Sequence, residues 1–393
     1  MSLDAELSQR LDALREQNLF RQPRRVDSPQ SAHIQIDGKP YLNFSSNDYL
    51  GLANHPALKQ AAIHTIKKFG AGSGAARLVC GSLAPFHELE TALARFKQTE
   101  AALSFSTGYA AALGTIGALT GRGDIIILDK LVHASIVDAA RLSGAKIRVF
   151  AHNDLKDLEK KLKWAVNSRR PSGKGRILIV TESIFSMDGD AAPLHEIVAL
   201  KHKYGAWLMV DEAHATGILG KNGRGLADHL GLGSQIEIQM GTLGKALGAS
   251  GGFICGSRPL IDLLVNRARS FIFSTAPVPA AAAAATAAIQ LVPSGEGQKR
   301  REQLKSLIKL FQSKLGNRKS EIPGAIIPIL VGNEAKAIKI AGKLSEQNIF
   351  VPAIRYPSVA RGASRLRVTL TAAHSNDDIC RLVGALKTLN IGL

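Results

Sequence analysis

The chain has 393 residues, of which 45% are hydrophobic and 5% aromatic, and its formal net charge is +18 at pH 7. This length allows a large core and a second, smaller unit, and the composition excludes disordered and fibrous proteins. No apolar run reaches the length of a membrane span, and residues 1–20 lack a signal-peptide pattern. Three scattered cysteines give neither a metal-binding spacing nor a disulfide framework. We therefore expect a globular protein of the reducing cytoplasm, without a metal.

The positive charge is spread along the chain. Basic runs such as 156–163 and 299–305 alternate with acidic and apolar positions, as the faces of exposed helices do. A nucleic-acid-binding protein would explain the charge, but the sequence has no nucleic-acid-binding motif and few aromatic residues. We interpret the charge as an exposed surface that can also steer an acidic substrate, and we expect no nucleic-acid or membrane partner.

Residues 1–25 have leucines at helical spacing, which predicts an amphipathic helix that ends near residue 23. A short strand pair follows at His33–Ile36 and Tyr41–Phe44, separated by the turn signal Asp37-Gly38. A polar loop then leads into a helix over Pro56–Phe69.

Helical stretches alternate with short apolar strands in the centre of the chain. The predicted strands are Ala101–Ser104, Ile125–Leu128, Lys146–Phe150, Ile177–Thr181, Trp207–Val210 and Ile236–Met240. The predicted helices are Phe86–Phe96, Ala110–Leu119, Ile136–Leu142, Leu155–Ser168 and Leu194–Tyr204. This alternation predicts an α/β fold with a mostly parallel sheet between helices, in which ligands bind at the carboxyl ends of the strands.

The last part of the chain predicts a smaller α/β unit. An Ala-rich helix runs from about residue 278 to Leu291, and residues 295–393 read helix–strand–helix–strand–helix, with strands near Ile326–Leu330 and Leu366–Leu370. We therefore divide the chain into an N-terminal helix and strand segment (1–45), a large domain (46–290) and a small C-terminal domain (291–393).

The stretch Gly241–Gly248 follows a predicted strand and holds one lysine, Lys245, among small residues. Such residues let a flat ligand approach the backbone. Apolar surroundings lower the pKa of a lysine and make its amine a nucleophile toward a carbonyl. An exposed lysine in a glycine-rich turn is the alternative reading, since most lysines lie at the surface.

Polar residues follow other predicted strands. Asp211 and His214 come directly after Trp207–Val210, and His133 lies beyond another strand; the small residues 106–110 precede a helix, where free N–H groups favour a phosphate. Each also has a structural reading, as a turn cap, a core histidine or a helix cap. Together, a lysine, a carboxylate, a phosphate cradle and histidines meet the requirements of pyridoxal 5'-phosphate (PLP).

These residues stand within motifs that resemble the α-oxoamine synthase family of fold-type I PLP enzymes. The resemblance covers nearly the whole chain, through Leu42–Leu52, Gly70–Gly81, Ser183–Asp190, Val210–Gly217, Gly241–Gly248 and Arg365–Arg367. It implies a PLP-dependent acyltransferase, a large domain with a mostly parallel sheet between helices plus a smaller C-terminal α/β domain, and a homodimer with shared active sites.

The resemblance implies a role for each candidate residue. Lys245 would form a Schiff base with PLP, Asp211 would pair with the ring nitrogen, and His214 would hydrogen-bond the phenolic oxygen. The other cofactor contacts would come from His133 on the ring face, Gly108 and Tyr109 at the phosphate, Ser186, Thr242, and the partner subunit's Thr275. The implied substrate-binding residues are Asn47 and Arg367 at the amino-acid carboxylate, Arg21 and Ser358 at the acyl group, and His133.

Two of these residues keep a structural alternative. Arg21 is equally compatible with a cap on a helix face, and Ser358 with the closing of a turn. The family often has threonine where Ser358 stands, so the hydroxyl is kept and a methyl contact is lost.

Within the family, residues 45–52 and 183–190 favour members that condense L-alanine with pimeloyl-CoA or a pimeloyl carrier protein in biotin biosynthesis, with release of CO2 and the free thiol. The alternatives are glycine C-acetyltransferase (2-amino-3-ketobutyrate CoA ligase), 5-aminolevulinate synthase, and an enzyme that joins serine to a long acyl chain. A Schiff-base aldolase would use Lys245 without a cofactor, and its preparation would be colourless.

Overall fold

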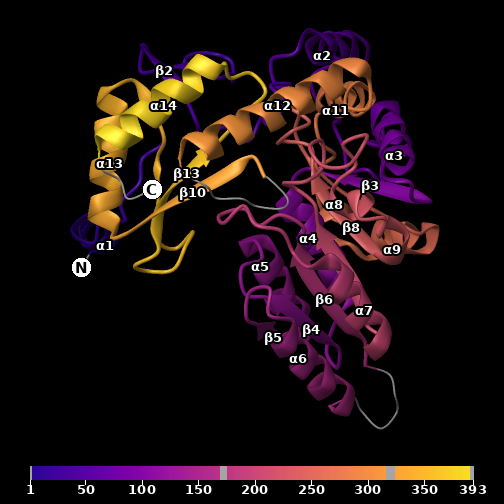
Figure 1. Ribbon diagram of the computed structural model, residues 1–393. Helices are drawn as coiled ribbons and strands as arrows, with labels where there is room; N and C mark the ends of the chain where they lie inside the picture. The colour runs from indigo at the N-terminus through magenta and orange to yellow at the C-terminus, as the bar shows by residue number, and fades with distance from the viewer. Residues whose placement is uncertain (1, 169–174, 316–323, 390–393) are drawn as a thin grey trace. The chain divides into compact units, whose positions relative to one another are not determined.

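The computed structural model describes residues 2–168, 175–315 and 324–389 (Figure 1). The chain divides into two compact units. The terminal unit comprises Met1–Gly51, Met187–Gly189 and Gln303–Leu393, and the central unit comprises Leu52–Ser186 and Asp190–Glu302. The domain boundaries expected from the sequence, after residues 45 and 290, stay predictions.

A seven-stranded sheet organises the central unit, with the strand order β3-β9-β8-β7-β6-β4-β5. β9 is antiparallel to both of its neighbours, and the other pairs are parallel, which confirms the predicted mostly parallel sheet. The strands are β3 (Ala101–Phe105), β4 (Ile125–Asp129), β5 (Lys146–Phe150), β6 (Ile177–Glu182), β7 (Trp207–Asp211), β8 (Ile238–Thr242) and β9 (Gly252–Gly256).

Helices cover both faces of this sheet (Figure 1). Ile126 and Leu128 of β4 pack into a core formed with α4, α5, α9 and α10, while the intervening Ile127 is equally buried on the other face, where α6 contacts β4. The helices are α2 (Pro56–Phe69), α3 (Ala84–Lys97), α4 (Gly108–Leu119), α5 (Ala134–Ser143), α6 (Leu155–Asn167), α7 (Leu194–Tyr204), α8 (Leu226–His229), α9 (Arg258–Arg267), α10 (Arg269–Ile272) and α11 (Pro279–Leu291).

The terminal unit contains two three-stranded sheets. One has the order β1-β2-β11, in which β11 runs parallel to β2; the other has the antiparallel order β10-β13-β12. Its elements are α1 (Leu3–Glu16), β1 (His33–Ile36), β2 (Lys39–Asn43), β10 (Ile326–Gly332), α13 (Glu334–Glu346), β11 (Ile349–Phe350), β12 (Ala353–Ile354), β13 (Ser364–Thr369) and α14 (Asn376–Thr388). Helix α12 (Gly295–Lys314) begins in the central unit and ends in the terminal one.

Several predicted elements have different bounds, among them the first helix and β8. The first helix ends at Glu16 rather than near residue 23, because Asn18 adopts a left-handed backbone with φ 57°. Strand β8 begins at Ile238 rather than Ile236, because a 3-10 turn over Gly233–Gln235 precedes it.

Strand β9 was not predicted. Its first residue must be glycine, since a Cβ at Gly252 would lie 2.6 Å from the Cα of Gly108, where α4 begins. Among the helices that the structure describes, none has the length and apolar character needed to span a bilayer.

Candidate active site

Polar side chains gather where the parallel strands of the central sheet end. Glu182 ends β6, Asp211 ends β7 and Thr242 ends β8. The strand register places Glu182 beside Asp211, and Asp211 beside Met240. Each of these strands therefore ends in a polar residue at the same edge of the sheet, which is where ligands of α/β proteins bind.

Lys245 lies in the turn after β8, and its Nζ is 2.8 Å from Nε2 of His214. Lys245 is half-buried and His214 is buried. The charge of Lys245 acts on both Asp211 and His133. The structure thus brings together the four residues for which the sequence predicts a catalytic role.

The carboxyl group of Asp211 is buried, and its Oδ1 accepts a hydrogen bond from the backbone N–H of Ala213 at 2.9 Å. Burial raises the pKa of this carboxyl, while Lys245 and the Ala213 N–H favour its charged form. A further cation against Asp211 would stabilise the carboxylate, and the protonated nitrogen of a pyridine ring is such a cation.

His133 caps the N-terminus of α5, with its Nδ1 accepting the backbone N–H of Ser135 at 3.2 Å. The residue as a whole is exposed, but dense packing around the ring lowers its pKa, against the opposing effect of Asp211. The ring is therefore neutral at neutral pH, which suits a flat apolar contact with another ring.

The N-terminus of α4 adjoins this cluster. Thr107 caps the helix, its Oγ1 accepting the N–H of Ala110 at 3.0 Å, and the first helical residues are Gly108 and Tyr109. A Cβ at Gly108 would lie 3.9 Å from the Cβ of Thr242, so this end of the helix faces Thr242. The first N–H groups of a helix lack intrahelical acceptors and attract anions, so a phosphate fits here.

The other predicted cofactor residues have different surroundings. Thr242 donates from Oγ1 to the carbonyl of Gly251 at 3.0 Å. Ser186 is half-buried in the loop after β6. Thr275 is exposed and forms an antiparallel bridge with Ala76. The contact of Thr275 with the site of a partner subunit stays a prediction.

Two predicted substrate residues, Asn47 and Arg367, meet in the terminal unit. Nη1 and Nη2 of Arg367 each donate to Oδ1 of Asn47 at 3.2 Å, and the Tyr49 hydroxyl donates to the same oxygen at 3.2 Å. Burial raises the pKa of Tyr49 to about 12, so its hydroxyl keeps the proton that it donates. The result is a buried guanidinium with a fixed orientation.

The other two, Arg21 and Ser358, meet at one turn of the terminal unit. Nη2 of Arg21 donates to the carbonyls of Arg355 and Tyr356 at 3.1 and 2.9 Å. The backbone N–H of Ser358 donates to the Arg355 carbonyl at 3.1 Å. These bonds place both side chains at the same exposed turn.

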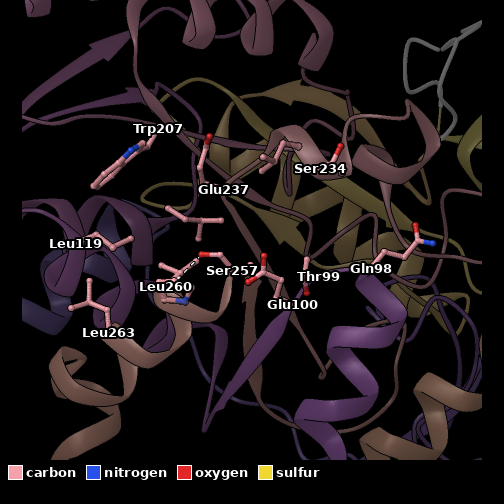
Figure 2. A pocket seen from close by; sticks show the side chains of 15 residues that line it. Gln98, Thr99, Glu100, Leu119, Trp207, Ser234, Glu237, Ser257, Leu260 and Leu263 are labelled. Carbon is pink, nitrogen blue, oxygen red and sulfur yellow. Dashed lines mark hydrogen bonds between the residues drawn. The ribbon is translucent and has the colours of Figure 1, made fainter.

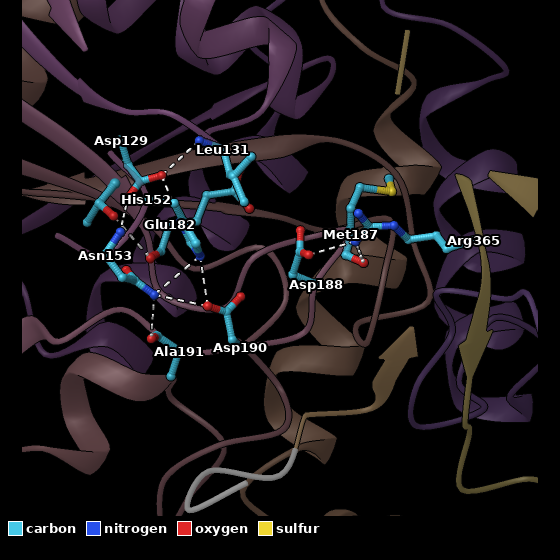
Figure 3. A network of polar contacts seen from close by, with 11 residues as sticks. Asp129, Leu131, His152, Asn153, Glu182, Met187, Asp188, Asp190, Ala191 and Arg365 are labelled. Carbon is cyan, nitrogen blue, oxygen red and sulfur yellow. Dashed lines mark hydrogen bonds and ion pairs between the residues drawn. The ribbon is translucent and has the colours of Figure 1, made fainter. Parts of the chain in front are cut away.

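A charged network beside the candidate site was not predicted (Figure 3). His152 contacts Asp129 through Nδ1 at 2.9 Å and Asp190 through Nε2 at 2.8 Å. Burial opposes the charged ring, but the two carboxylates outweigh it and raise the pKa of His152 to about 10. The sequence signal was a histidine two residues after the strand Lys146–Phe150. The network holds the loop that carries Ser186.

Asp188, in the part of the same loop that belongs to the terminal unit, is held differently. Nη1 of Arg365 donates to Oδ1 of Asp188 at 2.6 Å and to the carbonyl of Met187 at 3.1 Å (Figure 3). Arg365 lies in a motif that the sequence singled out, but no role was predicted for it.

A separate hollow of about 590 Å³ lies at the opposite end of the central strands (Figure 2). Two carboxylates in it are already engaged: Glu237 pairs with Lys201, and Glu100 accepts the N–H of Arg258 at 2.8 Å. Its other lining residues include Leu119, Trp207, Leu260 and Leu263. We therefore place the candidate active site at the carboxyl ends of the strands.

Comparison with known proteins defines the class to which this fold and site belong. Residues 39–386 match the family described as aminotransferase class I and II. The chain belongs to this family. Serine palmitoyltransferase from S. paucimobilis, solved with bound PLP and myriocin, has a TM-score of 0.90 and 31% sequence identity, over 99% of this chain and 98% of that one.

Closer relatives in sequence share one name. The chain is 49% identical to 8-amino-7-oxononanoate synthase of Geotalea daltonii over 379 residues, which cover 96% of this chain and 95% of the relative. It is 45% identical to that of Methylococcus capsulatus, over 96% of each. The solved 8-amino-7-oxononanoate synthase of Francisella tularensis has a TM-score of 0.73 and 29% identity, over 89% of this chain and 97% of that one.

Proposed function

We propose that this chain is a PLP-dependent acyltransferase that condenses L-alanine with a pimeloyl thioester to give 8-amino-7-oxononanoate, CO2 and a free thiol in biotin biosynthesis. Relatives that are 43–49% identical along nearly the whole chain support this reaction by their name. The observation that carries the chemistry is the contact between Lys245 and His214 beside the buried carboxyl of Asp211.

The residues present fit PLP. Burial leaves the Asp211 carboxyl in need of a cation, and the start of α4 opposite Thr242 suits a phosphate. When bound, PLP supplies an aldehyde that an amine can capture and a ring that takes up an electron pair. Lys245 would hold the aldehyde carbon, Asp211 the proton on the ring nitrogen, and His133 and His214 the ring itself.

Lys245 is the group that moves a proton. Its Nζ would take the α-proton of L-alanine and later return a proton to the product, while His214 orients the amine. Asp211 keeps its charge facing the ring nitrogen in a site with little water, where such a fixed charge stabilises a reacting group most strongly.

Asn47, Arg367, Arg21 and Ser358 are the residues that would bind the substrates. Arg367, held by Asn47 and Thr369, offers guanidinium N–H groups that suit the amino-acid carboxylate. Arg21 and Ser358 would meet the acyl donor, which is a CoA or carrier-protein thioester. The positive net charge favours either acidic donor.

The proposal includes a homodimer in which each active site uses the partner subunit's Thr275. The exposure of Thr275 supports this arrangement. It also includes a reducing, cytoplasmic setting, which is supported by three cysteines that form no disulfide.

One observation favours a second reaction, the joining of serine to a long acyl chain. The backbone matches serine palmitoyltransferase with a TM-score of 0.90, against 0.73 for the Francisella enzyme. Sequence identity favours alanine and the pimeloyl group, at 49% against 31%.

The test combines purified protein with each amino acid and each thioester, and weighs the products. We expect the mass of 8-amino-7-oxononanoate from L-alanine with pimeloyl-CoA or a pimeloyl carrier protein. Turnover only with glycine and acetyl-CoA or succinyl-CoA, or with serine and palmitoyl-CoA, would contradict the proposed substrates.

The cofactor has its own test. Borohydride reduction should bleach the yellow protein and add a pyridoxyl group to the peptide that contains Lys245. Full activity of a colourless, PLP-free preparation would instead indicate a cofactor-independent aldolase.

A further inference from the structure

Glu182 is a buried acid for which the proposed mechanism has no use. It is 2% exposed and follows Leu178 and Val180 along β6, both of which belong to the core beneath α4 and α5. Side chains two residues apart on a strand share one face. Asp211 continues the same face of β7 after Met209, and it is the register partner of Glu182. Two buried carboxyl groups therefore stand side by side.

The carboxyl group of Glu182 joins two loops of the site. It accepts the backbone N–H groups of His133, which follows β4, and of Ser186, which follows β6. Both residues are predicted cofactor contacts. Loss of this acceptor would release both loops at the same time.

One carboxyl oxygen of Glu182 accepts no hydrogen bond from the described residues. This oxygen, Oε1, is buried. A buried carboxylate is stable only when its oxygens are paired, whereas a neutral carboxyl group tolerates one unpaired oxygen at lower cost.

The neighbouring charges also favour the protonated form of Glu182. Burial and the neighbouring Asp211 raise the pKa of Glu182 to about 8, against the opposing effects of Lys245 and the two N–H groups. The charged groups that act on Glu182 are Asp211, at the end of β7, and Lys245, in the turn after β8. Adjacent carboxyl groups that share one cation also tend to share one proton.

We propose that Glu182 is a positioning residue, which stays protonated at neutral pH so that Asp211 alone carries the negative charge, and which fixes the backbone of His133 and Ser186. The inference rests on the proposed binding of PLP, but not on the identity of the amino acid or thioester. The pH dependence has a definite sign. In the unfolded chain Glu182 ionises near its usual pKa of about 4.5, so the stability that it contributes is present below that pH and is lost as pH rises through about 8.

The principal test is Glu182→Gln, which keeps an acceptor oxygen for the two N–H groups and cannot ionise. Between pH 6 and pH 9 we expect the melting temperature of the variant holoprotein to fall less than that of the parent. The absorbance of bound PLP should lose any titration step near pH 8, and the dissociation constant of PLP at pH 7 should stay within about twofold. The same pH dependence in parent and variant would overturn the proposal.

A second variant tests the positioning role. Glu182→Leu removes the acceptor, and we expect the dissociation constant of PLP to rise at least tenfold in a chain with unchanged far-UV circular dichroism. Unchanged PLP affinity would overturn this role. If the leucine variant does not fold, the titration of the glutamine variant decides.

The matched control is Glu237→Gln, at a paired carboxylate that precedes β8 at the other end of the sheet. It should leave the PLP titration unchanged. Because these measurements need no substrate, failure of the product assay and failure of this inference can be told apart.

Discussion

Two lysines of the central unit lie near neighbouring acidic residues, in opposite situations. Lys97 pairs with Glu212 and donates to the Arg224 carbonyl at 2.5 Å, and the other Glu212 oxygen accepts the Ala227 N–H at 2.9 Å. The side chains of the pair are 1% and 0% exposed.

Lys245, by contrast, is half-buried and contacts a histidine beside Asp211, the residue that precedes Glu212. Burial raises the pKa of Asp211. Adjacent residues therefore have different roles. Glu212 stabilises the fold through a buried ion pair, whereas Asp211 lies near Lys245 and His133 in the candidate site.

The strongest test of this difference removes Lys97. Lys97→Met should destabilise the protein by about 3–5 kcal/mol, because it leaves the Glu212 carboxylate buried without its cation. Urea unfolding at pH 7 measures the loss. PLP should still attach to Lys245 in the folded fraction. A loss of less than 1 kcal/mol in the free energy of unfolding would mean that water reaches the pair.

The double variant Lys97→Met with Glu212→Gln sharpens this test. It removes both charges and keeps an acceptor for the Ala227 N–H, so we expect it to recover a large part of the lost stability.

Asp211→Asn tests the role of the carboxylate near Lys245. It should leave the free energy of unfolding nearly unchanged or raise it, because a buried charge is removed, and it should slow turnover by about 10³-fold or more, or about 4 kcal/mol. Steady-state kinetics with PLP in excess measure the rate. Asp262→Asn, at an exposed position of α9, is the control. Near-normal turnover of Asp211→Asn would rule out the proposed role of Asp211, which is to keep the PLP ring able to take up an electron pair.

His152 is an intermediate case. Like Lys97 it pairs with carboxylates, in this case two, but its side chain is 23% exposed. Its raised pKa means that its stabilising effect is full below about pH 6.5 and is lost as pH rises through about 10. His152→Gln should therefore cost about 2 kcal/mol at pH 6 and much less at pH 10.5. Urea unfolding of parent and variant at both pH values checks this. An equal cost at both would show that charge is not the cause.

The smallest effect is expected at the surface. Helix α1 buries no residue, and Leu7 is 44% exposed. Leu7→Ser should change the free energy of unfolding by no more than about 0.5 kcal/mol, which sets the baseline for the buried variants. A loss above 1 kcal/mol in the same assay would mean that α1 packs against another surface in solution.

The sequence predicted the parallel strands well because most are rich in apolar residues, such as Ile125–Leu128 or Ile177–Thr181, and alternate with helical stretches. It missed β9 because glycines stand at both of its ends, and glycine usually marks a turn. The strands β11 and β12 have two residues each, too few for a local pattern, and β11 pairs with β2, a segment distant in sequence.

Motifs in the sequence indicated the candidate site residues, but they did not indicate which of the titratable side chains are protonated. The sequence places Glu182 directly after an apolar strand, yet its protonation depends on burial and on Asp211, which lies 29 positions later and becomes a neighbour only through the sheet register. His152 was missed for the same reason, since neither Asp129 nor Asp190 is close to it in sequence.

The pairing of β11 with β2 has a consequence for synthesis on the ribosome. Leu42 leaves the ribosome about 300 residues before its strand partner Ile349, which at ordinary rates of elongation is roughly 15–60 s earlier. All strands of the central sheet have been synthesised once Gly256 is made, so this sheet does not depend on later parts of the chain. One edge of β2 therefore stays without its partner β11 until translation is nearly finished, and an unpaired strand edge is prone to aggregation.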